Sequence, residues 1–264
     1  MGSATRESLS AARSALAALG GKDGLAIGEQ LFEAGRVIGG SAQLRAVFAD
    51  PSAAAADKKA VIDALFAGLG APARGLLAEI VSGRWSTQDD LLAGIEEIGI
   101  RAVAGSAGAK SSVESELFTF GAAVSSDPEL ELAVGSKLGS AASKSALVTK
   151  LLKGKATDQT LAIVNHLVQQ PRGRRIGELV RSAASIVADQ AGLAVATVLS
   201  AAPLSEAQVE RLRAGLSKSQ GRELQINLVV DPAIIGGLRV QIGDDVIDGS
   251  VSTRLTDLRL KLVS

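Results

Sequence analysis

The spacing of apolar residues changes once along this chain of 264 residues, near Gly192. Before that point, apolar residues recur every three or four positions, as at Leu9, Ala12, Leu16 and Leu19. After it they alternate with other residues, as at Leu193, Val195, Thr197 and Leu199. The first spacing predicts amphipathic helices and the second predicts strands. We therefore expect a mostly α protein, in which an N-terminal helical bundle precedes a small α/β C-terminal domain over residues 192–264.

The region after Gly192 predicts the order of elements in this α/β domain. We expect strands at residues 193–199, 224–230, 238–242 and 246–247. A helix from 205 to about 218 lies between the first two strands, and Ser205 with Gln208 forms a capping box at its start. A strand, a helix and a strand in this order predict a crossover unit, which is expected to be right-handed if the two strands are parallel. An amphipathic helix that carries Val251, Leu255, Leu258 and Leu262 is expected to close the chain.

The helical part contains an internal repeat. At a displacement of about 86 residues, the helical face of Ile27, Leu31, Ala34 and Ile38 falls on Val113, Leu117, Phe120 and Val124. The same displacement brings residues 58–62 onto residues 144–148. Several successive elements in one register predict a duplicated module. We expect a first helical bundle over residues 1–106 and a second module over residues 107–191.

Local signals also mark where helices begin. Ser86 with Asp89, and Ser111 with Glu114, each match a capping box. Pro72 suits the first turn of a helix, where its missing N–H would have no partner in any case. These positions predict helix starts near residues 71, 87 and 112.

Composition and charge exclude several classes of function. The 28 basic and 28 acidic residues cancel, and aromatic residues make up 2% of the chain. Nucleic-acid binding needs a basic face or stacking aromatics, so this class is disfavoured. There is no cysteine, which excludes disulfides and thiolate sites and fits a reducing cytoplasm. No apolar run approaches the roughly 18 residues of a membrane span, and the start lacks the apolar run of a signal peptide.

The sequence offers no catalytic or nucleotide-binding constellation. His166 is the single histidine and lies in an apolar helical segment, which favours a hydrogen-bonded structural role. No G-x-S-x-G element accompanies it. Gly154-Lys155 and Gly21-Lys22 both lack the upstream glycine and the downstream hydroxyl residue of a phosphate loop. We therefore expect no catalytic residue and no cofactor.

Two charged clusters have more than one interpretation. Asp244, Asp245 and Asp248 could hold a cation, but they lack the spacing of a calcium loop, so a turn is favoured and no metal is expected. The basic cluster of Arg172, Arg174 and Arg175 is either a solvated loop or a docking patch for an acidic partner segment. Trp85, at a helix end, fits the edge of a core or an interface.

The segment 231–250 closely resembles the signature of the ATP synthase delta subunit family, whose mitochondrial counterpart is the oligomycin-sensitivity-conferring protein. Its signature positions are Asp231, Pro232, Gly236, Gly237, Gly243, Asp248, Gly249 and Ser250. Gly236 and Gly237 permit a bend or a close backbone approach, and Gly243 supplies a tight turn. These residue types indicate a structural motif and not a catalytic one.

The resemblance implies a non-catalytic stator subunit of the rotary proton-translocating ATP synthase. It implies that the helical region binds the alpha subunits of the catalytic head, and that the C-terminal domain binds the b subunit of the peripheral stalk. It also implies a peripheral location at the cytoplasmic face of the bacterial cell membrane. Family members have one six-helix bundle before the α/β domain, so this longer chain resembles the enlarged form of actinobacteria. A helical-repeat scaffold of another assembly is the alternative.

Overall fold

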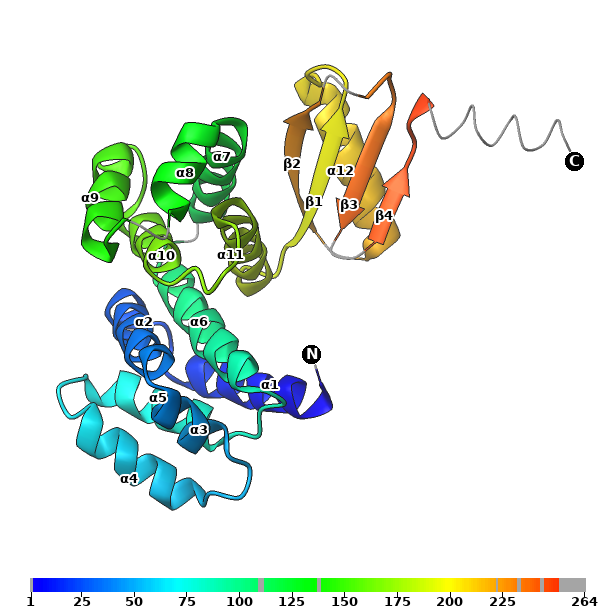
Figure 1. Cartoon of the computed structure of the whole chain (residues 1–264). Coiled ribbons are helices and arrows are strands. Elements are labelled where there is room, and N and C mark those ends of the chain that lie inside the picture. The colour runs from blue at the N-terminus through cyan, green and yellow to red at the C-terminus, as the bar shows by residue number, and fades with distance from the viewer. Residues whose placement is uncertain are drawn as a thin grey trace, which may run out of the picture. The chain divides into compact units, whose positions relative to one another are not determined.

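The computed structural model describes residues 2–108, 112–136, 139–221, 223–231, 234–242 and 245–251. The chain divides into two compact units, Met1–Val187 and Ala188–Ser264. The first unit is helical, and the second contains a four-stranded sheet and one described long helix. The fold class expected from the change in apolar spacing is confirmed. Figure 1 shows the order of the elements along the chain.

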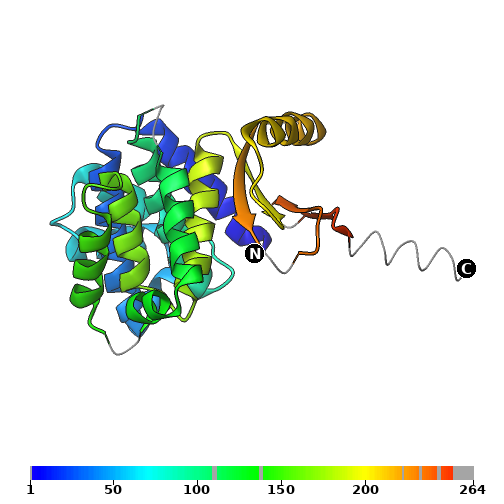
Figure 2. The ribbon, with the colours of Figure 1, turned by 90° about the horizontal axis from the view of Figure 1, so that it is seen from above.

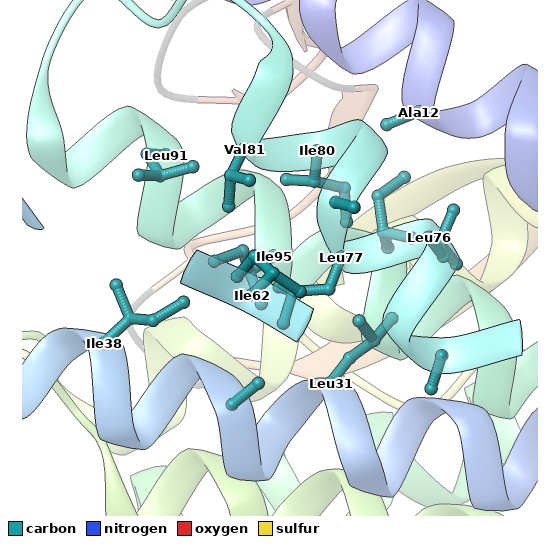
Figure 3. Close-up of a cluster of buried hydrophobic side chains, with 14 of the residues drawn as sticks. Ala12, Leu31, Ile38, Ile62, Leu76, Leu77, Ile80, Val81, Leu91 and Ile95 are labelled. Carbon is teal, nitrogen blue, oxygen red and sulfur yellow. The ribbon is translucent and has the colours of Figure 1, made fainter. Parts of the chain in front are cut away.

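The first six helices surround one hydrophobic core. They are α1 (Ser3–Ala18), α2 (Gly24–Gly40), α3 (Ala42–Ala49), α4 (Ala55–Leu65), α5 (Ala71–Ser82) and α6 (Gln88–Gly105). Each contributes side chains that are almost fully removed from solvent, among them Ala12, Leu31, Ile62, Leu77 and Ile95. Figure 3 shows these side chains converging from α1, α2, α4, α5 and α6. Burial of a set of this kind is the main source of stability for the bundle.

Local capping defines the ends of several of these helices. Pro72 occupies the first turn of α5, as predicted. The side chain of Thr87, and not that of Ser86, accepts the hydrogen bond from Asp90 N at the start of α6. The expected capping box at Ser86 is therefore wrong by one residue, because the Ser86 hydroxyl accepts a hydrogen bond from Thr5 of α1 instead. The second expected box, at Ser111, lies outside the described residues.

The next five helices surround a second core. They are α7 (Val113–Ser126), α8 (Pro128–Gly135), α9 (Ala141–Leu152), α10 (Asp158–Gln169) and α11 (Ile176–Gln190). Leu117, Val148 and Ile163 are fully buried in this core. It also receives Phe32 from α2 and Ile100 from α6. The two cores thus share α2 and α6.

Helix α6 is buried around its whole circumference because it serves both cores. Leu91, Ile95 and Ile98 face the first core, whereas Ile100 and Val103 face the second. Helix α2 packs closely along it: a Cβ added at Gly28 would lie 2.6 Å from the Gly99 carbonyl oxygen. The two backbones can approach this closely because both positions lack a side chain.

The helices of the two groups recur at a constant displacement. Moved by 86 residues, the bounds of α3 fall on those of α8, and the bounds of α4 and α5 fall within one residue of those of α9 and α10. A polar contact recurs with them. Gly70 N donates to Gln30 Oε1 at 2.8 Å, and Thr157 N donates to Glu116 Oε2 at 2.9 Å. In the first group, Gln30 of α2 thus caps the start of α5. In the second group, Glu116 of α7 caps the start of α10 in the same way.

The second unit is an α/β domain. Its strands are β1 (Ala194–Ser200), β2 (Leu224–Val230), β3 (Leu238–Ile242) and β4 (Asp245–Asp248), in the order β2-β1-β3-β4. Strand β1 is parallel to β2 and antiparallel to β3, and β3 is antiparallel to β4. The predicted crossover unit is present, and its two strands are parallel.

One helix, α12 (Glu206–Gln220), covers one face of this sheet, as Figure 2 shows. Ala196, Val198, Ile226, Val240 and Ile242 point from the strands into the core of this unit. The predicted capping box is present, because the side chains of Ser205 and Gln208 each accept from the other's backbone N–H. The expected closing helix lies outside the described residues except for Val251.

Candidate functional site

The described signature residues lie at one end of the sheet, where β2 and β4 end and β3 begins. Asp231 follows β2, and its N–H donates to the Ser200 carbonyl at the end of β1 (2.9 Å). Gly236 and Gly237 precede β3, and Asp248 ends β4. Pro232 and Gly243 lie outside the described residues. The segment therefore connects all four strands of the unit.

Gly237 lies at the tightest point of this connection. Its φ is +84°, a region that residues with a side chain rarely adopt. A Cβ at this position would also lie 2.5 Å from the Gly249 carbonyl oxygen. Gly249 N donates to the Leu238 carbonyl, and Val251 N donates to the Gly236 carbonyl, each at 2.9 Å. The chain entering β3 and the chain leaving β4 are thus held together by backbone contacts.

Asp248 has a local structural contact. Its Oδ1 accepts a hydrogen bond from Ser250 N at 2.9 Å, which is typical of an Asx turn. Asp245, which the sequence placed in a turn, is the first residue of β4 and pairs with Ile242. Asp244 lies outside the described residues. Within the described ranges, no group of three or more histidines, cysteines or carboxylates could hold a metal ion.

A buried charged cluster joins α6 to α10 and to the loop before α11. Glu96 of α6 is only 8% exposed. Its carboxylate lies 3.0 Å from the guanidinium nitrogens of both Arg172 and Arg174. Burying a carboxylate is costly unless it is paired, and two guanidinium groups supply that pairing here. The cluster therefore connects the two helical groups through charge as well as through apolar packing.

The His166 ring lies beside this carboxylate. It stacks on Phe32 of α2, with 4.0 Å between the ring centroids and 9° between the planes. Its Nε2 is 3.4 Å from Glu96 Oε2, and neither ring nitrogen makes a hydrogen bond among the described residues. The buried structural position of His166 is confirmed, but the expected hydrogen bond is not. Stacking in an apolar contact between α2 and α10 takes its place.

Burial and charge act in opposite directions on this cluster. Burial raises the pKa of Glu96, but the hydrogen bonds from Arg174 and the charges of both arginines act against burial, and the pKa is lowered to about 2. Burial lowers the pKa of His166, although Glu96 acts against this. Glu96 is therefore ionised and His166 neutral near pH 7.

The basic cluster of the sequence is therefore used within the chain. Arg172 and Arg174 bind Glu96, so neither the solvated loop nor the docking patch describes them. Glu96 was missed because its partners lie 70 or more positions away in sequence. A carboxylate between the apolar Ile95 and Ile98 was the signal that could have drawn attention to it.

Trp85 fits its predicted place at a core edge: it is 6% exposed and its Nε1 donates to the Ile80 carbonyl at 2.8 Å.

Apolar surface is exposed in both units. A cavity of about 510 Å³ opens between α7, α8 and the end of α9, lined by Phe120, Ala123, Leu130, Leu151 and Leu152 among others. Among the described residues of the second unit, the large apolar side chains that remain exposed are Val230, Ile235, Val246, Ile247 and Val251. Ile235, within the signature, is 81% exposed. Such surface is typical of proteins that bind other chains.

None of the described helices is both long and apolar enough to cross a membrane.

The comparisons with known proteins give one consistent result. The family model "ATP synthase delta (OSCP) subunit" matches residues 100–262. The chain is 55% identical over 262 residues to the ATP synthase subunit delta of Leifsonia xyli, with 99% of each chain covered. It is 38% identical over 268 residues to the subunit delta of Streptomyces avermitilis, covering 99% of this chain and 98% of the relative.

Among solved structures, a chain of the Toxoplasma gondii mitochondrial ATP synthase hexamer matches 64% of this chain and 96% of its own length. The identity is 19% and the TM-score is 0.42, too low to establish a shared fold. The family assignment rests on the sequence matches alone. With a family model over more than half of its length and full-length relatives of the same name, this chain belongs to the ATP synthase delta (OSCP) subunit family.

Proposed function

We propose that this chain is the non-catalytic stator subunit that connects the catalytic head of the ATP synthase to its peripheral stalk. The family match over residues 100–262 carries this proposal. The head must be kept from turning with the rotor if rotation is to drive ATP synthesis. A subunit with two compact units can bind the head with one and the stalk with the other, and the two contacts reinforce each other through effective concentration.

We assign the ordinary family bundle to the second helical module. The family match begins at residue 100, near the end of α6, and so includes α7–α11 and the C-terminal unit. Residues 1–99 are then the addition that makes this chain long. The recurring helix bounds and the equivalent caps of Gln30 and Glu116 support a duplication, with domains at 1–106, 107–191 and 192–264.

The partners follow from the same assignment. In this proposal the helical region binds the N-terminal helices of the alpha subunits, because an apolar groove between helices suits an incoming amphipathic helix. The C-terminal unit binds the b subunit, and the exposed apolar side chains around Ile235 supply a surface for it. Both partners belong to a complex at the cytoplasmic face of the bacterial cell membrane, to which this chain attaches peripherally.

Site-specific crosslinking in the assembled complex tests this division. A truncation before residue 86 is a poor test, because it removes the first core from around α6 and exposes Leu91, Ile95 and Ile98. A photo-reactive residue placed at an exposed position leaves the fold intact. Suitable positions are Leu132 on α8, 71% exposed, and Ile235 in the signature.

We expect crosslinks to an alpha subunit from the helical region and to the b subunit from Ile235. A photo-reactive residue at Leu65, which is exposed on α4 of the first module, tests in the same way whether the added module also contacts the catalytic head. Crosslinks from Ile235 to alpha and from the helical region to b would contradict the division. Crosslinks only to proteins outside the ATP synthase would favour the alternative, a scaffold of another assembly.

A further inference from the structure

The cavity of about 510 Å³ lies in the second helical module, between α7, α8 and the end of α9. Its apolar lining includes Phe120, Leu130 and Leu152, which belong to the second core or pack against it. Ala123 of α7 and Leu151 of α9 also line it. A groove lined in this way by several helices has the form that accepts the apolar face of an added helix.

The first module closes the same place with its own side chains. At the displacement of 86 residues, Phe66 and Leu69 stand where the second module has Leu152 and Lys155. Phe66 is 6% exposed in the first core, and Leu69 packs against that core. The second module has a smaller side chain at one of these positions and a charged one at the other, so its groove stays open.

The second helix of each module contributes to the same difference. Ala34 and Val37 of α2 correspond to Phe120 and Ala123 of α7. Phe120 is 6% exposed, so its ring lies in the second core. The exposed Ala123 leaves room where Val37 stands in the first module.

Lys155 gives the groove a positive charge that the chain does not compensate. Glu116 also lines the groove, but its Oε2 accepts hydrogen bonds from Thr157 N at 2.9 Å and from Thr160 Oγ1 at 2.6 Å. The Glu116 charge is therefore directed at the N-terminus of α10. Lys155 is exposed, and across the ranges that the structure describes no carboxylate pairs with it. The groove thus complements a helix that carries a carboxylate beside its apolar face.

The equivalent place in the first module has the opposite charge. Glu29 and Glu33 stand at the positions of Ser115 and Thr119, which line the groove of the second module. A partner helix with a carboxylate at this position would be repelled there. Charge therefore directs such a helix to the second module.

We propose that the groove of α7, α8 and α9 binds the N-terminal helix of one alpha subunit, with apolar side chains against Phe120 and Leu151 and a carboxylate facing Lys155. This inference rests on the proposed function, which assigns alpha to the helical region and b to the C-terminal unit. The family match supports the choice of module, because residues 100–262 include this groove and exclude α2, α3 and α4, which form the equivalent place in the first module.

The test uses the full-length chain and a fluorescently labelled peptide of the alpha N-terminal segment, with affinity measured by fluorescence anisotropy. Ala123→Trp, which fills the groove from an exposed position, is expected to weaken binding by about tenfold or more. Lys155→Glu is expected to weaken it by about fivefold, because attraction at the rim becomes repulsion. With a peptide whose carboxylates are changed to amides, the difference between Lys155→Glu and the wild type should vanish.

Two variants are matched controls. Val37→Trp changes the equivalent exposed position of the first module, and Lys153→Glu changes an exposed lysine that does not line the groove. Both should bind the peptide as the wild type does. Thermal unfolding of each variant is compared with that of the wild type, and the surface change Lys155→Glu keeps the test decisive even where a tryptophan disturbs the module.

Each other outcome overturns the inference in a recognisable way. If the wild type and all variants bind the peptide equally, this groove is not the docking surface, while the proposed function stands. If Val37→Trp weakens binding instead, alpha binds the first module. If Lys155→Glu binds as the wild type does, the predicted carboxylate is wrong. If Ala123→Trp abolishes self-association, the occupant is a second copy of the chain. If the wild type does not bind the peptide, the groove assignment fails, and the crosslinks from Leu132 decide whether the proposed function fails with it.

Discussion

Replacing Glu96 by glutamine removes the charge on which the buried cluster depends while keeping the shape of the side chain. The pKa of Glu96 is lowered from 4.5 to about 2 in the folded chain. A shift of this size corresponds to roughly 3 kcal/mol of stability at pH 7, at 1.36 kcal/mol per unit. We expect Glu96→Gln to lower the free energy of unfolding of the helical unit by about that amount.

The pH dependence gives this prediction its sharpest form. A depressed carboxylate pKa contributes stability that is fully present above pH 4.5 and is lost as the pH falls through about 2. The difference in unfolding free energy between wild type and Glu96→Gln should therefore be largest near pH 7. It should be less than half as large at pH 3 and nearly vanish at pH 2.

Urea unfolding of the full chain, followed by far-UV circular dichroism between pH 2 and 7, measures this difference. Glu79→Gln, on the exposed face of α5, is the matched control and should be neutral at every pH. A Glu96→Gln chain as stable as the wild type at pH 7 would refute the reasoning. So would a difference that stays constant with pH, because a charge-independent packing defect would then explain it.

Three further predictions test other parts of the structure. Gly237→Val should destabilise the C-terminal unit by roughly 1–3 kcal/mol and leave the helical unit unchanged in calorimetry, since the new side chain meets the Gly249 carbonyl. Gly215→Val, in open space on α12, is the control and should be neutral or slightly stabilising, because glycine is the poorer helix former. Glu116→Ala should lower helical-unit stability by about 1–2 kcal/mol in urea unfolding, because it uncaps α10. Titration of the chain with Mg-ATP should show no saturable heat; micromolar binding would contradict the absence of a phosphate loop.

Features set by neighbouring residues were predicted well. The alternating apolar pattern located β1 and β2 to within one residue, and the bounds of β3 were correct. The capping box of Ser205 and Gln208 is present because both of its partners lie within one helical turn. The box at Ser86 failed for the opposite reason: a distant residue, Thr5, competes for that hydroxyl.

The charged cluster could not be predicted, because it depends on contacts between distant segments. Glu96, His166 and Arg174 come from three different places in the sequence and meet only when α10 packs on α2 and α6. The arginines therefore looked like a surface loop. The sharing of α6 between two cores was likewise invisible, because Ile98 and Ile100 have similar hydropathy but face different cores.

Membrane vesicles that contain the ATP synthase without this subunit provide the most direct test of the central claim. ATP hydrolysis and ATP-driven proton pumping are measured before and after the purified chain is added back. A stator subunit is needed for coupling but not for hydrolysis. We expect hydrolysis to proceed without the chain, and proton pumping to be restored only when the chain is present. Proton pumping that is equal with and without the chain would contradict the stator assignment.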